Sequence, residues 1–261
     1  MKNHSSYLLL ASLLMASVAL FSGCKRDEDD SQPTVGSVSF AVANVVGTQP
    51  LALDGTAYTT ASGETFTVST FEYYVSNIKF TKSDGTTYAA PNEYHLVNTA
   101  KPASTSFTVS NVPTGDYTGV SFIVGVDSTT TKGDPLALTG DLNPALAMHW
   151  AWNTGHIFLK LEGTVTSASP SKVLTCHIGG YRAPYSAIVT AAPSLNGATL
   201  LVRAGQTPKV ALTADVLKIF DGPTKFALSN FPTAMMPSAA SVQVANNYAA
   251  GMFSVKQIQA N

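Results

Sequence analysis

The residues best suited to chemistry lie in one stretch, 148–163, which reads MHWAWNTGHIFLKLEG. It holds both tryptophans of the chain, Trp150 and Trp152, and two of its five histidines, His149 and His156. Imidazole is the commonest nitrogen ligand of copper and zinc in proteins. A Trp-x-Trp pair is equally suited to plugging an apolar core. The composition alone therefore leaves two interpretations open, a metal site or a packed core.

Two further histidines, His95 and His177, stand among strand-forming residues. Because neighbouring residues of a strand alternate faces, His177 should project away from Cys176 and Ile178. A single histidine beside a sheet is usually a hydrogen-bonded rim residue. Several histidines in a chain with only 12% charged residues favour a metal site. The sequence has no paired cysteines for a closed tetrahedral zinc module.

Common catalytic patterns are absent from the sequence. It contains no Gly-x-Ser-x-Gly, no His-Glu-x-x-His, no phosphate-binding glycine loop and no dinucleotide fingerprint. Asp127 and Glu162 lie near the ends of predicted strands, where solvated carboxylates are a simpler interpretation than a glycosidase pair. We therefore expect a binding protein rather than an enzyme. The 15 Lys plus Arg against 16 Asp plus Glu form no basic patch, so nucleic acid is not an expected partner.

The first residues are typical of an export signal. Residues 1–23 combine a positive start with a short apolar run and end in Phe-Ser-Gly before Cys24, which resembles a bacterial lipobox. An ordinary signal peptide with an incidental cysteine is the alternative. We expect Cys24 to carry lipid, residues 24–34 to form an acidic tether, and the protein to be anchored at the outer membrane or cell surface.

With Cys24 lipidated, Cys176 has no partner within the chain. It is either a buried small hydrophobe or a reactive or ligating thiol. Burial is favoured because Cys176 alternates with Leu174 and Ile178 on one face of a predicted strand.

Residues 35–261 are expected to form one all-β domain. Short alternating runs rich in Val, Thr, Phe and Tyr are separated by Gly, Pro, Asn and Asp, and helical periodicity is almost absent. The predicted strands are 38–42, 64–68, 71–80, 94–97, 106–109, 117–127, 156–162, 173–178, 199–202 and 210–216, of which 117–127 is the longest.

This pattern predicts a single β-sandwich with mainly antiparallel, Greek-key-like strands. Residues 128–147 lose the alternation and should form one long ordered loop, a type of segment that is often functional. A short helix after Phe220 has little support in the sequence.

The stretch 148–163 resembles the hallmark segment of the MbnP-like family, Met-x-Trp-x-Trp-x-x-Gly-aromatic followed by a strand that ends near Glu-Gly. Those proteins are secreted copper-binding proteins found beside methanobactin systems and, as lipoproteins, in Bacteroidetes. Further matches follow in order over about residues 36–220. They are Tyr-Tyr-Val-Ser-Asn-Ile at 73–78, Tyr-His-Leu-Val at 94–97, Gly-Asp-Tyr at 115–117, Gly-Val-Asp-Ser at 125–128 and His-Ile-Gly-Gly-Tyr at 177–181.

The resemblance implies a β-rich domain that binds one copper ion. In characterised relatives, a tryptophan near the metal is oxidised to kynurenine by a partner, a dihaem peroxidase of the MauG type. Carried over by matched motif, His177 is the first candidate ligand, His95 the second, and His149 a further one. Trp150 or Trp152 is the candidate for oxidation.

The sequence also departs from the family pattern. His149 and His156 stand where relatives commonly carry an aromatic residue, and His156 is expected to be a simple aromatic replacement. The cysteine pairs of the methanobactin-associated branch are missing, which places the chain in the lipoprotein branch. The rival hypothesis is a surface interaction module. It would bind glycan or protein through loop 128–147, with Trp150 and Trp152 stacking on a sugar or packing the core.

Overall fold

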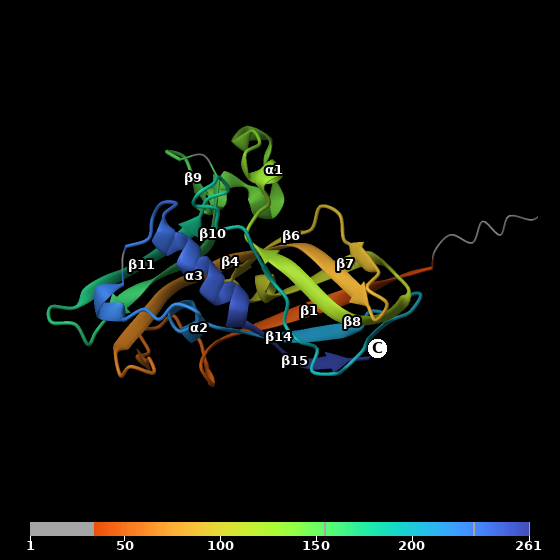
Figure 1. Ribbon diagram of the computed structural model, residues 1–261, viewed down its shortest axis with the longest axis horizontal. Helices are drawn as coiled ribbons and strands as arrows, with labels where there is room; N and C mark the ends of the chain where they lie inside the picture. The colour runs from red at the N-terminus through yellow and green to blue at the C-terminus, as the bar shows by residue number, and fades with distance from the viewer. Residues whose placement is uncertain (1–33, 154, 232, 261) are drawn as a thin grey trace, which may run out of the picture. The chain divides into compact units, whose positions relative to one another are not determined.

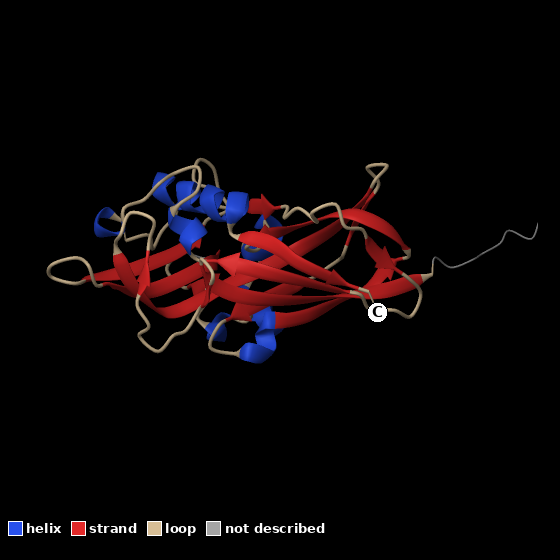
Figure 2. Ribbon diagram, turned by 90° about the horizontal axis from the view of Figure 1, so that it is seen from below, coloured by secondary structure: helices blue, strands red, loops and turns tan. Residues whose placement is uncertain are grey.

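Two β-sheets form the body of the protein in this computed structural model, which describes residues 34–153, 155–231 and 233–260 (Figure 1). The expected signal peptide, Cys24 and all but the last residue of the expected tether lie outside the described residues. Most of the described elements are strands, which confirms the predicted all-β sandwich. Figure 2 shows that the helices gather over one half of the body.

The smaller sheet has the strand order β15-β14-β1-β2, with β7 also paired to β1. Its strands are β1 (Val35–Val46), β2 (Gln49–Pro50), β7 (Ser106–Pro113), β14 (Lys209–Asp215) and β15 (Phe253–Gln259). β1 and β14 run parallel, and the other neighbours run antiparallel.

The larger sheet has the order β11-β10-β4-β8-β12, and its described pairs are antiparallel. The main strands are β4 (Thr65–Lys82), β8 (Gly115–Val124), β10 (Gly155–Val165), β11 (Lys172–Gly179) and β12 (Val189–Ala191). Short strands pair at the margins, namely β3 (Tyr58–Thr59), β5 (Thr87–Ala89), β6 (Tyr94–Asn98), β9 (His149–Trp150) and β13 (Leu200–Val202).

The expectation that 117–127 is the longest strand is wrong, because β4 has 18 residues. The sequence runs 64–68 and 71–80 join into this one strand. The pairing of β4 with β10 shifts register where Glu162 faces Thr70 and Gly163 faces Val68, so Ser69 forms a bulge. A bulge interrupts the alternation of side chains without ending the strand, and this is why the sequence suggested two strands.

The helices are α1 (Ser128–Thr131), α2 (Leu217–Phe220) and α3 (Ala239–Gly251). The sequence pattern did not predict α3, whose alanines, valines and asparagines give only a weakly amphipathic helix. Ser238 caps its first turn by accepting a hydrogen bond from the Ser241 N–H. Val244 and Tyr248 are buried where α3 packs against β11, β12 and α2. None of the helices that the structure describes is long and apolar enough to cross a membrane.

The predicted ordered loop, 128–147, is confirmed. It consists of α1 and three 3-10 turns, η2 (Pro135–Ala137), η3 (Gly140–Leu142) and η4 (Pro144–Leu146). Side chains of Asp127, Asp134 and Asn143 accept hydrogen bonds from the first N–H groups of α1, η2 and η4 respectively. These local caps explain how the segment is ordered without strand pairing.

The core between the sheets is rich in aromatic side chains. Phe253 of the smaller sheet contacts Tyr73 and Phe122 of the larger one edge-on, with ring centroids 5.6 and 4.9 Å apart. Tyr73 also donates a hydrogen bond to Asn44 Oδ1 on β1 at 2.8 Å, so a polar contact joins the two sheets inside the core.

Replacing Tyr73 by Phe should destabilise the fold. The change leaves the side-chain oxygen of the partly buried Asn44, Oδ1, without its hydrogen-bond donor, which costs about 1–3 kcal/mol. Tyr88→Phe is the matched control, because the Tyr88 hydroxyl donates to an exposed carbonyl of Asn111. Its effect should stay within about 0.5 kcal/mol. Urea unfolding measures both, and equal losses would contradict the role assigned to Tyr73.

Candidate functional site

The tryptophan stretch folds into a short hairpin made by β9 and the start of β10. His149 pairs with His156, and Trp150 pairs with Gly155. Because adjacent strand residues point to opposite faces, His149 and Trp150 project to opposite sides of this hairpin. The hairpin therefore has an imidazole face and an indole face.

On the indole face, Trp150 reaches across β10 to the end of β11. A Cβ atom at Gly179 would lie 2.8 Å from the Trp150 ring and 2.5 Å from the carbonyl oxygen of His156. Gly179 therefore permits this close approach. Trp150 is only 5% exposed, and its Nε1 has no hydrogen-bond partner in the described part of the chain.

Trp152 differs sharply from Trp150, since it is 61% exposed. The two ring centroids are 5.6 Å apart and their planes are tilted by 42°. One indole thus packs in the protein, as a core residue would, while its neighbour presents a large apolar surface to solvent. Neither of the two interpretations from the sequence describes both residues.

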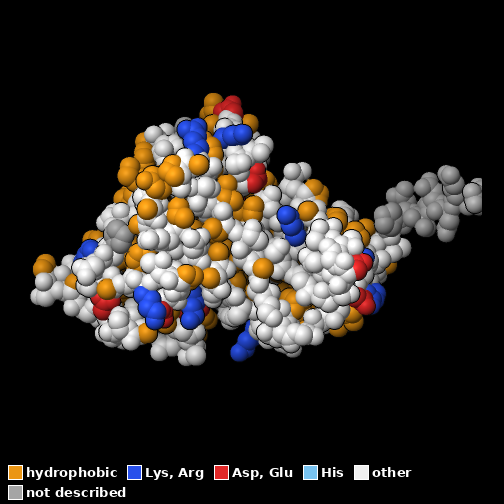
Figure 3. All heavy atoms as spheres, viewed as in Figure 1, with side chains coloured by type: hydrophobic (Ala, Val, Ile, Leu, Met, Phe, Trp, Pro, Cys, Tyr) orange, Lys and Arg blue, Asp and Glu red, His pale blue; other side chains and the backbone are white. Residues whose placement is uncertain are grey.

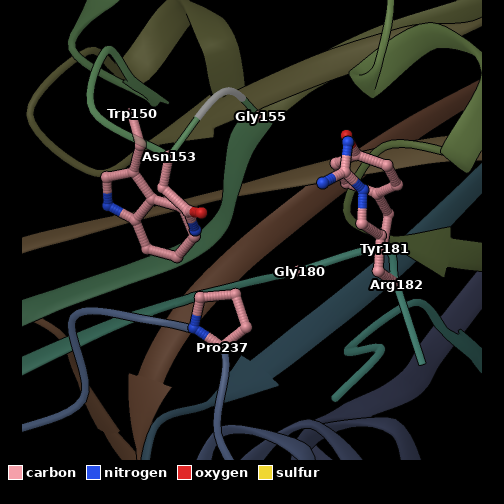
Figure 4. Close-up of a pocket in the computed structure, with 7 residues that line it drawn as sticks. All are labelled: Trp150, Asn153, Gly155, Gly180, Tyr181, Arg182 and Pro237. Carbon is pink, nitrogen blue, oxygen red and sulfur yellow. The ribbon is translucent and has the colours of Figure 1, made fainter. Parts of the chain in front are cut away.

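A small pocket opens beside Trp150 (Figure 4). Trp150 and Asn153 lie on one side of it, Tyr181 and Arg182 on the other, and Pro237 below. Gly155 and Gly180 complete the lining. Its cavity volume is about 50 Å³, enough for a few atoms but not for a whole ligand.

On the imidazole face, the rings of His149 and His156 meet edge to face, with centroids 5.1 Å apart. His156 Nε2 lies 3.3 Å from the Leu142 carbonyl oxygen, which can only accept, so this nitrogen carries the proton. His156 Nδ1 then accepts from the Thr131 hydroxyl at 3.1 Å. Burial lowers the pKa of His156 from 6.5 to about 4, so this histidine is neutral at physiological pH.

His156 also meets Tyr74 edge-on, at 5.6 Å between ring centroids. This contact agrees with its expected role as an aromatic replacement. His149 has a different environment, because its Nε2 is buried and has no hydrogen-bond partner among the described residues. Burial also lowers the pKa of His149. His149 is therefore a neutral imidazole with an unused nitrogen.

His177 lies on β11 and, as predicted, faces away from the buried Cys176 and Ile178. It shares its face with Gly179, and therefore with the Trp150 ring. Its Nε2 is 2.7 Å from Glu162 Oε1, while Thr70 donates to the other oxygen of Glu162 at 3.0 Å.

The pKa shifts of His177 and Glu162 indicate the protonation state of this pair. Burial lowers the pKa of His177, although the Glu162 carboxylate opposes the shift. Burial alone would raise the pKa of Glu162, but the hydrogen bonds from His177 and Thr70 hold it below its ordinary value. A neutral His177 that donates from Nε2 to an ionised Glu162 keeps its lone pair on Nδ1.

His95 lies elsewhere in the molecule. Its ring stacks on Phe107 with centroids 4.0 Å apart, and its Nε2 pairs with Glu93 at 2.8 Å. Within residues 34–153, 155–231 and 233–260, no three His, Cys, Asp or Glu side chains gather into a group that could hold a metal ion. His95, His149 and His177 therefore do not gather at one metal position in the described residues, and the role of any one of them as a ligand stays a prediction.

The expectation that Asp127 and Glu162 are simply solvated is also wrong. Asp127 caps α1 and accepts a hydrogen bond from Tyr94, and Glu162 is paired with His177. The sequence could not reveal the second pair, because it depends on the register that places Lys160 opposite His177 and Glu162 opposite Thr175. Cys176, in contrast, is buried and free as predicted, and burial raises the pKa of its thiol.

Comparisons with known proteins agree with this fold. A family model described as MbnP matches residues 35–237. The solved structure of MbnP from Methylosinus trichosporium is similar with a TM-score of 0.54 and 14% sequence identity, over 87% of this chain and 99% of that chain. At that identity the likeness is one of fold. A search of the curated proteins found no match.

The environment of His156 predicts a pH-dependent stability. Its pKa is 6.5 when exposed and about 4 in the folded protein, so between these values the unfolded chain binds the extra proton. The free energy of unfolding should fall by up to about 3 kcal/mol as the pH drops through this window. Urea unfolding from pH 7 to pH 4 measures this fall, and His156→Gln should flatten the curve. Parallel curves for the two proteins would contradict the assignment.

Proposed function

The chain belongs to the MbnP family, and on that premise we propose that it binds copper on the indole face of the β9–β10 hairpin. The family model covers residues 35–237, a span that includes the hairpin and β11. The proposed role is copper capture or delivery, and binding rather than catalysis.

The observation that carries the proposal is the pair formed by His177 and Glu162. Histidines that ligate metals almost always donate their second ring N–H to a carboxylate or carbonyl, which fixes the tautomer and the ring orientation. Glu162 accepts from His177 Nε2 at 2.7 Å and leaves the Nδ1 lone pair unused. Neutral imidazole nitrogen is a good donor for copper, and His177 shares its face with Trp150.

On the indole face, the unmodified side chains described above supply one nitrogen ligand, His177 Nδ1. One ligand is too few to hold a copper ion, so the proposal includes a modified tryptophan. An indole offers a metal no lone pair, whereas oxidation to kynurenine produces an aniline nitrogen and a carbonyl oxygen. Trp150 is the proposed residue because its ring lies against Gly179, two residues from His177. A dihaem peroxidase of the MauG type would be the maturation partner. It would dock beside the exposed Trp152, whose ring lies next to Trp150.

Lipid attachment at Cys24 is part of the same proposal. The small residues before Cys24 and the acidic run after it support anchoring to the outer membrane or cell surface. A domain held there would meet copper outside the cytoplasm.

His149 is a second candidate position for the ion. Its buried Nε2 has no partner in the described structure, and it lies beside the ring of His156. His149 ranks below His177 because the two nitrogens of His156 are both engaged, by Thr131 and by Leu142. The two positions lie on opposite faces of the hairpin, so one substitution at each separates them.

His177→Ala should abolish stoichiometric copper binding, because it removes the imidazole donor. Protein purified from its native host is dialysed against copper, and the metal per chain is measured by atomic absorption. Glu162→Gln should keep the fold but weaken copper affinity by about 10- to 100-fold, since it removes the orienting carboxylate.

His95→Ala is the matched control for this experiment. His95 also pairs with a glutamate, at 2.8 Å, but it stacks on Phe107 and should leave the copper content unchanged. Loss of copper in His149→Ala with retention in His177→Ala would move the site to the imidazole face. A parent protein that retains no copper would reject the proposed function.

Peptide mapping of protein from the native host should find the oxidised product at Trp150. Conversion of tryptophan to kynurenine adds one oxygen atom and removes one carbon atom. Recombinant protein made without the peroxidase should carry unmodified indoles and bind copper more weakly. Copper-loaded native protein with both indoles intact would remove the kynurenine from the proposal while leaving His177 to be tested.

A further inference from the structure

The pocket beside Trp150 offers hydrogen-bonding groups that the protein itself does not use. In the described chain, neither the Asn153 amide nor the Arg182 guanidinium forms a side-chain hydrogen bond or an ion pair, and the buried Trp150 Nε1 has no acceptor. Arg182 rests on the ring of Tyr181, with its central carbon 4.9 Å from the ring centroid. Stacking of this kind leaves the N–H edge of a guanidinium free to donate.

Several exposed apolar side chains belong to residues that are close in the sequence to the pocket lining. Trp152 precedes the lining residue Asn153, and Met235 and Met236 precede the lining residue Pro237. Tyr185 is also exposed, and its carbonyl oxygen lies next to Gly180. Figure 3 shows hydrophobic side chains gathered on the upper left of the molecule, over β9 to β11 and α3. An exposed patch of apolar side chains is typical of a binding site.

The size and floor of the pocket restrict what it can hold. A volume of about 50 Å³ is far below the roughly 300–1,000 Å³ of pockets that enclose a small molecule. The backbone of Gly155 and Gly180 lines the pocket, and a Cβ on Gly180 would meet Pro237 at 2.9 Å. The site therefore suits one edge of a ring, with the rest of the ligand lying against the exposed Trp152.

We propose that this pocket binds a saccharide, and acidic sugars more tightly than neutral ones. A sugar ring has an apolar face for an exposed indole or phenol ring and many oxygen atoms for Asn153 and Arg182. Arg182 is the one charged residue in the pocket lining, and it favours a ligand that carries a carboxylate. This pocket shares Trp150 with the proposed copper site. The saccharide proposal is tested at Trp152 and Arg182 in protein whose indoles are unmodified, whereas the copper proposal is tested at His177 and Glu162.

Intrinsic fluorescence reports on this pocket directly, because both tryptophans of the chain stand at it. The full chain, freed of metal with a chelator, is titrated with two matched pairs of probes. Sialyllactose is compared with lactose, and trigalacturonic acid with maltotriose. At least one acidic sugar should give a saturable change, with affinity about tenfold above that of its neutral partner.

Three substitutions of exposed residues separate the contributions. Trp152→Ala should weaken binding about tenfold or more, with Trp150 remaining as the reporter, and Arg182→Gln should remove the preference for the acidic sugar. Leu136→Ala is the control, because Leu136 is exposed in loop 128–147 and should have no effect.

Saturation-transfer NMR provides a second readout for the same four sugars. No saturable binding of any probe by either method would overturn the proposal. Binding that survives Trp152→Ala and Arg182→Gln but is lost in Leu136→Ala would also overturn it, because the sugar would then lie on the loop. Saturable binding of an acidic peptide with none of the sugars would reassign the pocket to a protein partner.

Discussion

The site depends on one hydroxyl group. The Thr131 oxygen accepts a hydrogen bond from the backbone N–H of His156 at 2.9 Å and, through its own proton, satisfies Nδ1 of the same residue. This double contact fixes the tautomer of His156 and ties loop 128–147 to the hairpin. Asp127 caps the helix that carries Thr131, so consecutive hydrogen bonds join the start of the loop to the hairpin.

The β9–β10 hairpin also separates two different groups of side chains, one on each of its faces. The imidazole face holds the buried His156, both of whose ring nitrogens are hydrogen-bonded, and the partly buried His149, whose Nε2 is enclosed. The indole face holds a histidine oriented by a carboxylate, next to an aromatic pocket open to solvent. Trp150 reaches the second face only because Gly179 has no side chain in its path. Few charged side chains line the indole face, and a set of neutral nitrogen ligands suits a softer metal ion better than a hard cation.

The sequence allowed good prediction of what depends on neighbours along the chain. Alternation correctly predicted that Cys176 is buried and that His177 lies on the opposite face of its strand. Features that depend on pairing between distant segments could not be predicted. The Glu162–His177 pair requires the register of β10 and β11, and the failure of three histidines to converge requires the path of every strand between them. Helix α3 was missed for another reason, because its buried side chains pack against α2, β11 and β12 without forming a regular amphipathic pattern.

The last strand of the chain lies beside β14, which in turn pairs with β1, the first strand described. β15 is thus an edge strand of the smaller sheet, and it lies beyond residue 237, where the family model ends. During synthesis, β14 lacks this partner until residues 253–259 have emerged. A chain that stops before β15 would expose the backbone edge of β14, and the unpaired edge of a strand is a template for pairing with other chains.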